Sequence, residues 1–192
     1  MADVPVRASP DYFLNTSKGV VSHPDLKTCK EEEFLKKVPG VTFAKHIQIR
    51  RGEETIPTNT FILTFDSPTP PTQIKAGYVK FNVRPYVPTP MRCFKCHRFG
   101  HGREKCRRKD PICGKCGKVG HAADNCKNYP YCVNCRGDHA ASGKECPKYA
   151  EEQAILRYRA YNGDTFQQAR AAVVLEVAKE VRPRTYAQVT KR

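Results

Sequence analysis

Residues 93–146 read CFKCHRFGHGREKC, RRKDPI, CGKCGKVGHAADNC, KNYPY and CVNCRGDHAASGKEC, and cysteine and histidine recur along them in one order. The first unit has the spacing C-x2-C-x4-H-x4-C, the second repeats it, and the third reads C-x2-C-x3-H-x6-C. The recurring residues are Cys93, Cys96, His101 and Cys106, then Cys113, Cys116, His121 and Cys126, then Cys132, Cys135, His139 and Cys146. Three thiolates and one imidazole form the donor set of a closed tetrahedral zinc site. The sequence therefore predicts three zinc ions per chain, one in each of residues 93–106, 113–126 and 132–146.

Each of these units is too short to hold a hydrophobic core. Folding of such a loop depends on its metal, which contributes about 10–16 kcal/mol of apparent binding free energy at neutral pH. Gly100 and Gly120 each precede a histidine, where a turn without a side chain lets the chain return toward the metal. We expect three zinc knuckles with little regular structure, disordered in the absence of zinc.

Ten cysteines also allow a disulfide framework, but the pattern favours metal. Nine of the ten fall into C-x2-C…C triplets, each with one histidine at ligand distance, which disulfide pairing does not require. The N-terminal residues MADVPVRASPDYFLNTSKG contain no apolar run of the kind that a signal peptide carries, so an oxidising compartment is not indicated. We expect an intracellular protein.

The charge of the chain indicates a polyanionic partner. The formal net charge is +15, and three filled Cys3His sites, each with a net charge of −1, would lower it to about +12. Nucleic acid and an anionic membrane surface both fit such a charge. No basic amphipathic helix with bulky apolar anchors is evident, and no apolar run approaches a transmembrane length. We therefore expect single-stranded RNA or DNA as the partner, with RNA favoured, and no membrane.

The first two knuckles carry apolar residues among basic ones. A metal-fixed loop cannot bury Phe94 or Phe99 in a core of its own, so these rings are available to stack on unpaired bases, at about 1–3 kcal/mol per base. The alternative is that the basic run is only a solvated face. The predicted nucleic-acid contacts are Phe94, Lys95, Arg98, Phe99, Arg103, Arg107, Arg108, Lys109, Lys115, Lys118 and Val119.

The residues before the knuckles predict a small α+β domain. Residues 1–18 carry few signs of order and are expected to be a disordered tail. Within residues 19–87 we expect a strand at 19–21, a helix from about 22 to 37, and strands at 41–50, around 61–65 and at 77–86. This β-α-β-β-β order is close to that of an RNA-recognition motif (RRM), although the connection at residues 67–72 is short and rich in proline.

Two side-chain patterns refine this RRM-like domain. In the strand at 41–50, Val41, Phe43, Ile47 and Ile49 fall on one face, which predicts that this face is buried. In the following strand, Phe61, Leu63 and Phe65 could stack bases, as strand aromatics do in RRM domains, or belong to the core. We favour the core.

The remaining segments are predicted from composition and periodicity. Residues 88–92 form a proline-rich linker, residues 147–181 a helical hairpin, and residues 182–192 a basic tail. The second helix of the hairpin, about 165–181, has the apolar stripe Phe166, Ala169, Val173 and Val177 and a capping box of Asp164 with Gln167. The two helices could pack on each other or on a partner chain, so self-association through them or through the RRM-like domain is possible.

The segments CFKCHRFGH and CGKCGKVGH resemble retroviral-type CCHC zinc knuckles. The wider arrangement, with YVKFNVRPYVPTPMR before the knuckles and CPKYAEEQAILRYRAYNGDTFQQARAAV and TYAQVTKR after them, resembles the Gag-like protein encoded by the first open reading frame of LINE-type (non-LTR) retrotransposons. The resemblance covers roughly residues 19–192. It implies binding of the element's own RNA and its packaging as a ribonucleoprotein, in the cytoplasm or the nucleus. The sequence departs from the family in lacking the N-terminal portion that such proteins often carry and any reverse-transcriptase segment. We therefore expect a fragment or a remnant copy of such an element.

Three functions follow from these patterns. The first is a non-enzymatic protein that packages or chaperones single-stranded nucleic acid, and the alternative is a host adaptor whose knuckles and helical hairpin bind other proteins. A zinc enzyme is disfavoured, because four protein ligands leave no coordination position for a water molecule. The H-x-E and P-C-x-x-C motifs of nucleobase deaminases are also absent. We expect no catalytic site.

Overall fold

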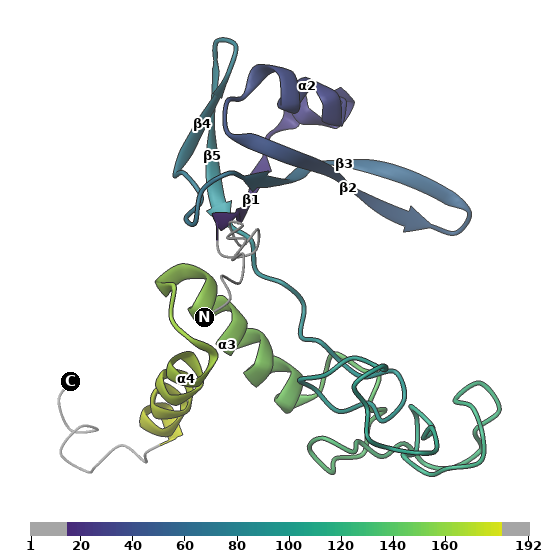
Figure 1. The fold of residues 1–192 in the computed structure, drawn as a ribbon. Coiled ribbons are helices and arrows are strands. Elements are labelled where there is room, and N and C mark those ends of the chain that lie inside the picture. Colours follow the sequence, from purple (N-terminus) through teal and green to yellow (C-terminus); the bar gives the residue numbers. More distant parts are fainter. Residues whose placement is uncertain (1–14, 182–192) are drawn as a thin grey trace, which may run out of the picture. The chain divides into compact units, whose positions relative to one another are not determined.

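The chain folds as two compact units that are divided between Tyr86 and Val87. The structure, a computed structural model, describes residues 15–181, with the side chains of residues 177–181 excepted. The first unit contains β1 (Ser17–Ser22), the 3-10 helix η1 (Pro24–Thr28), α2 (Glu31–Lys37), β2 (Val41–Arg51), β3 (Glu54–Phe65), β4 (Gln73–Ala76) and β5 (Val79–Pro85), and the second contains α3 (Pro147–Asn162) and α4 (Phe166–Val181) (Figure 1).

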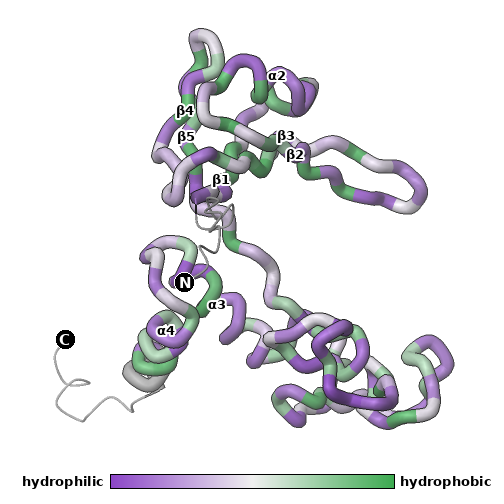
Figure 2. Tube along the Cα trace, in the orientation of Figure 1, coloured by the Kyte–Doolittle hydropathy of each residue, from purple (hydrophilic) through white to green (hydrophobic). Residues whose placement is uncertain are grey.

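The described part of the first unit is built on one five-stranded antiparallel sheet in the order β2-β3-β1-β5-β4. Hydrophobic and hydrophilic residues alternate along its strands (Figure 2), as expected for a sheet with one buried face. The α+β fold class is thus confirmed.

The core lies on the side of the sheet that η1 and α2 cover. Phe61 and Leu63 are fully buried, and Leu26 of η1 and Phe34 of α2 join the same apolar cluster. The rings of Phe34 and Phe61 lie 4.8 Å apart, between centroids. The strand residues around Phe61 therefore belong to the core and not to a base-stacking surface, as the sequence favoured.

The single helix predicted for residues 22–37 is wrong, because the segment divides into η1 and α2. Cys29 and Lys30 between them are in extended conformation. The backbone N–H of Lys30 donates to the carboxylate of Glu33, 3.4 Å away, which supports a fresh helix start at this point.

The predicted burial of β2 is also wrong beyond Val41. The register with β3 shifts between Val41 and Phe43, which turns Phe43 to the opposite face of the sheet, where its side chain is 54% exposed. Ala44 takes the buried position instead. A β-bulge inserts one unpaired residue and reverses the faces of those that follow. Ile49 lies beyond a second register shift, between His46 and Gln48, and it is exposed together with its neighbours Gln48 and Arg50.

The sequence prediction missed β4, which pairs with β5 as a hairpin where an RRM domain would have its second helix. The RRM-like description of residues 19–87 therefore stays a prediction. The first strand begins at Ser17, inside the segment expected to be a tail. Residues 1–14 of the tail predicted at 1–18, and the basic tail predicted at 182–192, lie outside the described residues.

In the second unit, α3 and α4 pack on each other through Ile155, Ala169 and Val173, so of the two arrangements left open by the sequence the described helices show an internal apolar contact. Its capping box is one residue later than predicted. The N–H of Thr165 donates to the side-chain oxygen of Gln168 at 3.0 Å, and the N–H of Gln168 donates to the hydroxyl of Thr165 at 3.4 Å. The predicted stripe residue Val177 lies outside the described side chains. Within residues 15–181, no helix is long and apolar enough to cross a membrane.

Truncating Phe61 to alanine should destabilise the sheet unit by about 3–5 kcal/mol, because a fully buried ring is removed and a cavity remains. The matched variant Phe43→Ala removes an exposed ring from the same sheet and should change stability little. Urea denaturation of the whole chain, followed by far-UV circular dichroism, compares the two. Equal destabilisation by both variants would contradict the assignment of faces.

Candidate metal centres and nucleic-acid interface

Three clusters of metal-ligating side chains lie among the described residues, and they contain all twelve predicted ligands. In each cluster, one potential ligand atom per residue can be chosen so that all four lie within 4.8 Å of one another. The first cysteine of each cluster is buried, Cys93 and Cys132 completely. The structure therefore assembles three Cys3His sites from segments with no helix or strand of their own.

The spacing of the ligand atoms fits zinc. Tetrahedral zinc with bonds of about 2.3 Å to sulfur and about 2.0–2.1 Å to nitrogen places two sulfurs about 3.8 Å apart and sulfur and nitrogen about 3.6 Å apart. The distance from Sγ to Nε2 is 3.2 Å for Cys96 and His101 and 3.4 Å for Cys135 and His139. The sulfurs of Cys132 and Cys146 are 3.6 Å apart, too far for a disulfide of about 2.05 Å.

One thiol in each site is prepared to ionise. Burial raises the pKa of Cys93, but the backbone N–H groups of Cys96 and Lys95 outweigh it and lower this pKa to about 7. Cys132 has the same balance and a pKa of about 7. In the second site the backbone N–H of Lys118 lowers the pKa of Cys116 to about 6. Because zinc binds thiolates, these amides favour the metal-binding form before any metal arrives.

The same turn forms each C-x2-C segment, including the third, whose later spacing differs. The fourth residue after the first cysteine donates its N–H to the carbonyl of that cysteine, at 2.7 Å in the first site, 2.9 Å in the second and 2.8 Å in the third. That residue is His97, Gly117 or Arg136, each with a positive φ, at 53°, 72° and 66°. The C-x2-C turn of the third site is therefore the same as in the other two, although the spacing from its histidine to its last cysteine is longer.

Successive knuckles are joined by a repeated hydrogen bond. The N–H of Ile112, just before the second knuckle, donates to the carbonyl of Lys95 at 3.0 Å, and the N–H of Tyr131, just before the third, donates to the carbonyl of Lys115 at 2.8 Å. A side chain at Gly114 would lie 3.1 Å from the His97 ring. The first two knuckles therefore pack so closely at Gly114 that a larger residue would require the His97 ring to move.

Two further hydrogen bonds tie the third knuckle to the first. Asn134 donates its side-chain amide to the carbonyl of His97 at 2.9 Å, and Arg92 donates its guanidinium to the carbonyl of Ala141, also at 2.9 Å. The three knuckles, residues 93–146, thus form one connected block, here called the knuckle block. The sequence analysis did not identify Asn134 or Arg92 as residues that join the knuckles. The only sequence signal of this packing is the small residue at Gly114.

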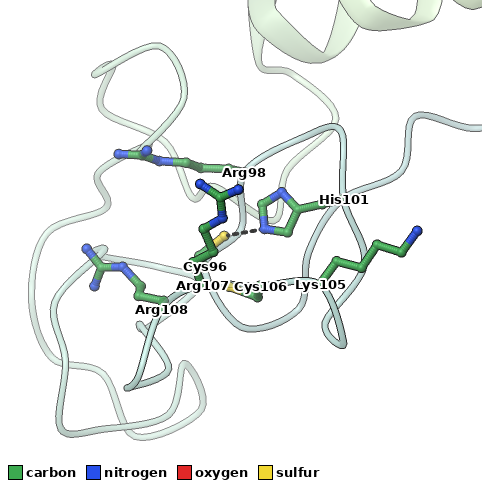
Figure 3. Close-up of a pocket in the computed structure, with 7 residues that line it drawn as sticks. All are labelled: Cys96, Arg98, His101, Lys105, Cys106, Arg107 and Arg108. Carbon is green, nitrogen blue, oxygen red and sulfur yellow. Dashed lines mark hydrogen bonds between the residues drawn. The ribbon is translucent and has the colours of Figure 1, made fainter.

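The first knuckle carries an exposed ring and a cleft lined by basic side chains, several of which are predicted contacts. Phe94 is 76% exposed. Beside the ligands, Arg98, Lys105, Arg107 and Arg108 line a cleft of about 510 Å³ (Figure 3). Lys105 was absent from the predicted contacts, although the basic run of the first knuckle contains it.

The other predicted contacts differ in how they are placed. Phe99 is half-buried, with its ring 6.1 Å from that of Tyr149 of α3, and Lys115 donates its ammonium to the carbonyl of Cys126 at 3.1 Å. Like Phe94, Arg98, Arg107 and Arg108, the predicted contacts Arg103, Lys109, Lys118 and Val119 are exposed, while Lys95 is half-buried. Tyr129, in the KNYPY connection, was missed although it is 94% exposed. All of these base and phosphate contacts stay predictions.

Comparisons with known proteins match parts of the chain. A family model described as a domain of unknown function (DUF8775) matches residues 18–85. The nucleic-acid-binding protein from mobile element jockey of Drosophila funebris is 43% identical over 64 residues, and that of Drosophila melanogaster is 40% identical over 71 residues. These matches cover 32% and 36% of this chain, but the chain spans only 11% and 12% of the two relatives. No solved structure gives a significant match.

Replacing Gly114 by valine should separate the first knuckle from the second, because the new side chain meets the His97 ring. We expect zinc content to stay at three ions and the amide hydrogen of Ile112 to exchange about fivefold faster, as for the removal of a contribution of about 1 kcal/mol. Gly102→Val is the matched control, since open space surrounds that position. Hydrogen exchange measured by NMR compares the variants, and equal exchange in both would contradict the packing.

Acidification should remove the zinc, because protons compete with it for thiolates. One thiol per site, that of Cys93, Cys116 or Cys132, has a pKa lowered to about 6–7 and loses its thiolate form as the pH falls through that range. Burial raises the pKa of a second thiol in each site, that of Cys96, Cys126 or Cys146, so bound zinc has to keep this one ionised. Native mass spectrometry should find three ions per chain at neutral pH and progressively fewer below about pH 6. Three ions retained in strong acid would argue against thiolate ligands.

Proposed function

We propose that this chain binds single-stranded nucleic acid, RNA in particular, through its zinc-loaded knuckle block and packages or chaperones it. One observation carries the proposal, namely that the first knuckle holds a 76% exposed ring, Phe94, on the same metal-fixed loop as a cleft lined by four cations. A ring offers a stacking surface for an unpaired base, and the cations attract the phosphates beside it.

The geometry favours a single strand over a duplex. A knuckle presents a ring and short loops rather than a helix or strand that could enter a major groove, and bases in a duplex have no free face for stacking. Because hydrogen bonds hold the three knuckles together, their contact groups are ordered before the strand binds. Ordering these groups then costs less conformational entropy on binding.

The similarity to mobile-element proteins supports a Gag-like role. Relatives over about a third of the chain are named nucleic-acid-binding proteins from the mobile element jockey, and the knuckles agree with such a role. We propose that the chain acts in a ribonucleoprotein of the cytoplasm or nucleus. The role is non-enzymatic, since each metal site has four protein ligands and therefore no open position of the kind found in catalytic zinc sites.

A second candidate, a protein-binding adaptor, is favoured by the outer surface of the helical hairpin. Val174 and Leu175 of α4 are 50% and 62% exposed, and exposed apolar side chains on a helix can contact another chain. The same surface is where self-association would occur. For such an adaptor the binding of nucleic acid is incidental.

Two variants of the first knuckle test the proposed function. Phe94→Ala should weaken binding of a single-stranded oligonucleotide by about 1–3 kcal/mol, the contribution of one base stack. The double variant Arg107→Gln with Arg108→Gln should lower the slope of log affinity against log salt by about 0.7 for each phosphate that the protein no longer neutralises. Fluorescence anisotropy over a range of salt concentrations measures both effects.

The matched control is Tyr161→Ala, which removes a 59% exposed ring from α3 and should leave the affinity unchanged. Binding that survives metal chelation at full strength would overturn the proposal, as would a preference for duplex. Unchanged affinity in the Phe94 variant, together with loss of a bound protein after Leu175→Ser, would favour the adaptor instead.

A further inference from the structure

The sheet of the first unit has a second face that α2 does not cover, here called the open face. It is defined by Lys18 and Val20 of β1, Phe43 and Lys45 of β2, Ile62 of β3, Lys75 of β4, and Lys80 and Arg84 of β5. Their neighbours along each strand, among them Val21, Ala44, Phe61 and Val83, belong to the core cluster, and side chains alternate between the two faces of a strand. The open face therefore lies opposite the core.

Charge is distributed unequally between the two faces. Lys18, Lys45, Lys75, Lys80 and Arg84 are all exposed on the open face, and the strand residues of β1, β4 and β5 that share it include no acidic side chain. On the other side, Asp25 in η1 and Glu31, Glu32 and Glu33 in α2 are interspersed with an equal number of lysines, Lys27, Lys30, Lys36 and Lys37. The open face is therefore a positive surface within a unit of mixed charge.

One cross-strand pair shows that these charges are not balanced within the sheet. Lys75 of β4 lies directly opposite Lys80 of β5 in the antiparallel register, and both side chains are exposed. Like charges in directly opposed positions destabilise a sheet. A bound polyanion would relieve this repulsion and gain the attraction of both ammonium groups.

The middle of the open face is mainly apolar, with one buried polar residue, Thr64, opposite both Lys18 and Phe43. Val20 pairs with Ile62, and Ile62 pairs with Lys45 on its other side. Phe43 lies at the edge of this strip, 54% exposed because the bulge in β2 turned it outward. The Arg84 guanidinium donates to the hydroxyl of Ser22 at 3.1 Å, which holds one cation beside the strip.

We propose that the open face is a second binding site for single-stranded nucleic acid, separate from the knuckles and independent of zinc. The cations at the margins of this face can contact the phosphates of a single strand, while its bases lie over the apolar strip between them. Only Phe43 offers a ring among the residues that define this face, so binding depends mainly on phosphate contacts, with a strong dependence on salt and little preference for sequence. The site would give residues 18–85, matched only by a domain of unknown function, a role in holding the strand.

The test compares two triple variants of the full chain that remove the same charge. The open-face variant carries Lys45→Gln, Lys75→Gln and Lys80→Gln, and the control carries Lys27→Gln, Lys30→Gln and Lys36→Gln, in and between η1 and α2. Both remove exposed side chains. Strands of about 30 nucleotides, which can reach beyond the knuckles, are compared with strands of about 8 nucleotides.

We expect the open-face variant to bind the long strand on the order of tenfold more weakly, with a salt slope lower by about 2, while the control is weakened far less. This difference should persist after zinc chelation. Photo-crosslinking of thiouridine-containing strands to the wild-type chain should label the peptide that contains Phe43.

Equal losses of affinity in both triple variants would overturn the proposal, because they would indicate only a general effect of charge. A lack of crosslinks to the peptide that contains Phe43 would also overturn it. So would the finding that the two triple variants differ in binding an acidic protein but not in binding nucleic acid. The proposed function of the knuckles fails separately, if zinc removal and Phe94→Ala leave the affinity unchanged while the two triple variants still differ.

Discussion

Coordination of a metal ion by three thiolates and one imidazole is the interaction on which residues 93–146 depend. These residues contain no helix or named strand, and the side chains buried there are mainly the ligands themselves. A structural zinc site supplies the folding free energy that such loops cannot obtain from a core. Everything presented by the knuckles, including the exposed ring of Phe94, is therefore held in place by the metal sites.

The metal sites alone would leave three loops free to move, and the hydrogen bonds between knuckles remove that freedom. A repeated hydrogen bond joins each knuckle to the next. It is donated by the residue just before the cysteine pair of the second and third knuckles, Ile112 and Tyr131, to the knuckle before it. The hydrogen bond from the side chain of Asn134 to the carbonyl of His97 connects the third knuckle directly to the first. A preorganised block can present several binding groups to one strand without ordering each group separately.

The two units solve the problem of stability in different ways and present similar chemistry. The sheet unit buries a continuous apolar cluster beneath η1 and α2, whereas the knuckle block relies on metal. Both nevertheless place cations around exposed apolar groups, at Arg98 and Phe94 in one case and at Lys45 and Phe43 in the other. A chain with net charge +15 can in this way offer two surfaces of the same kind to one polyanion.

The sequence by itself determined the twelve metal ligands, because ligand type and spacing are local properties that a short loop must satisfy. It also determined the α+β class and that Phe61, Leu63 and Phe65 share one face of a strand, since side chains alternate between the two faces; it favoured the core for that face, and packing against Phe34 decided it. Tertiary structure alone decided which face Phe43 occupies, because the bulge exists only in the pairing of β2 with β3. It also decided the packing of His97 on Gly114 and the link from Asn134 to His97, which join residues of different knuckles and leave no trace in the spacing of any one of them.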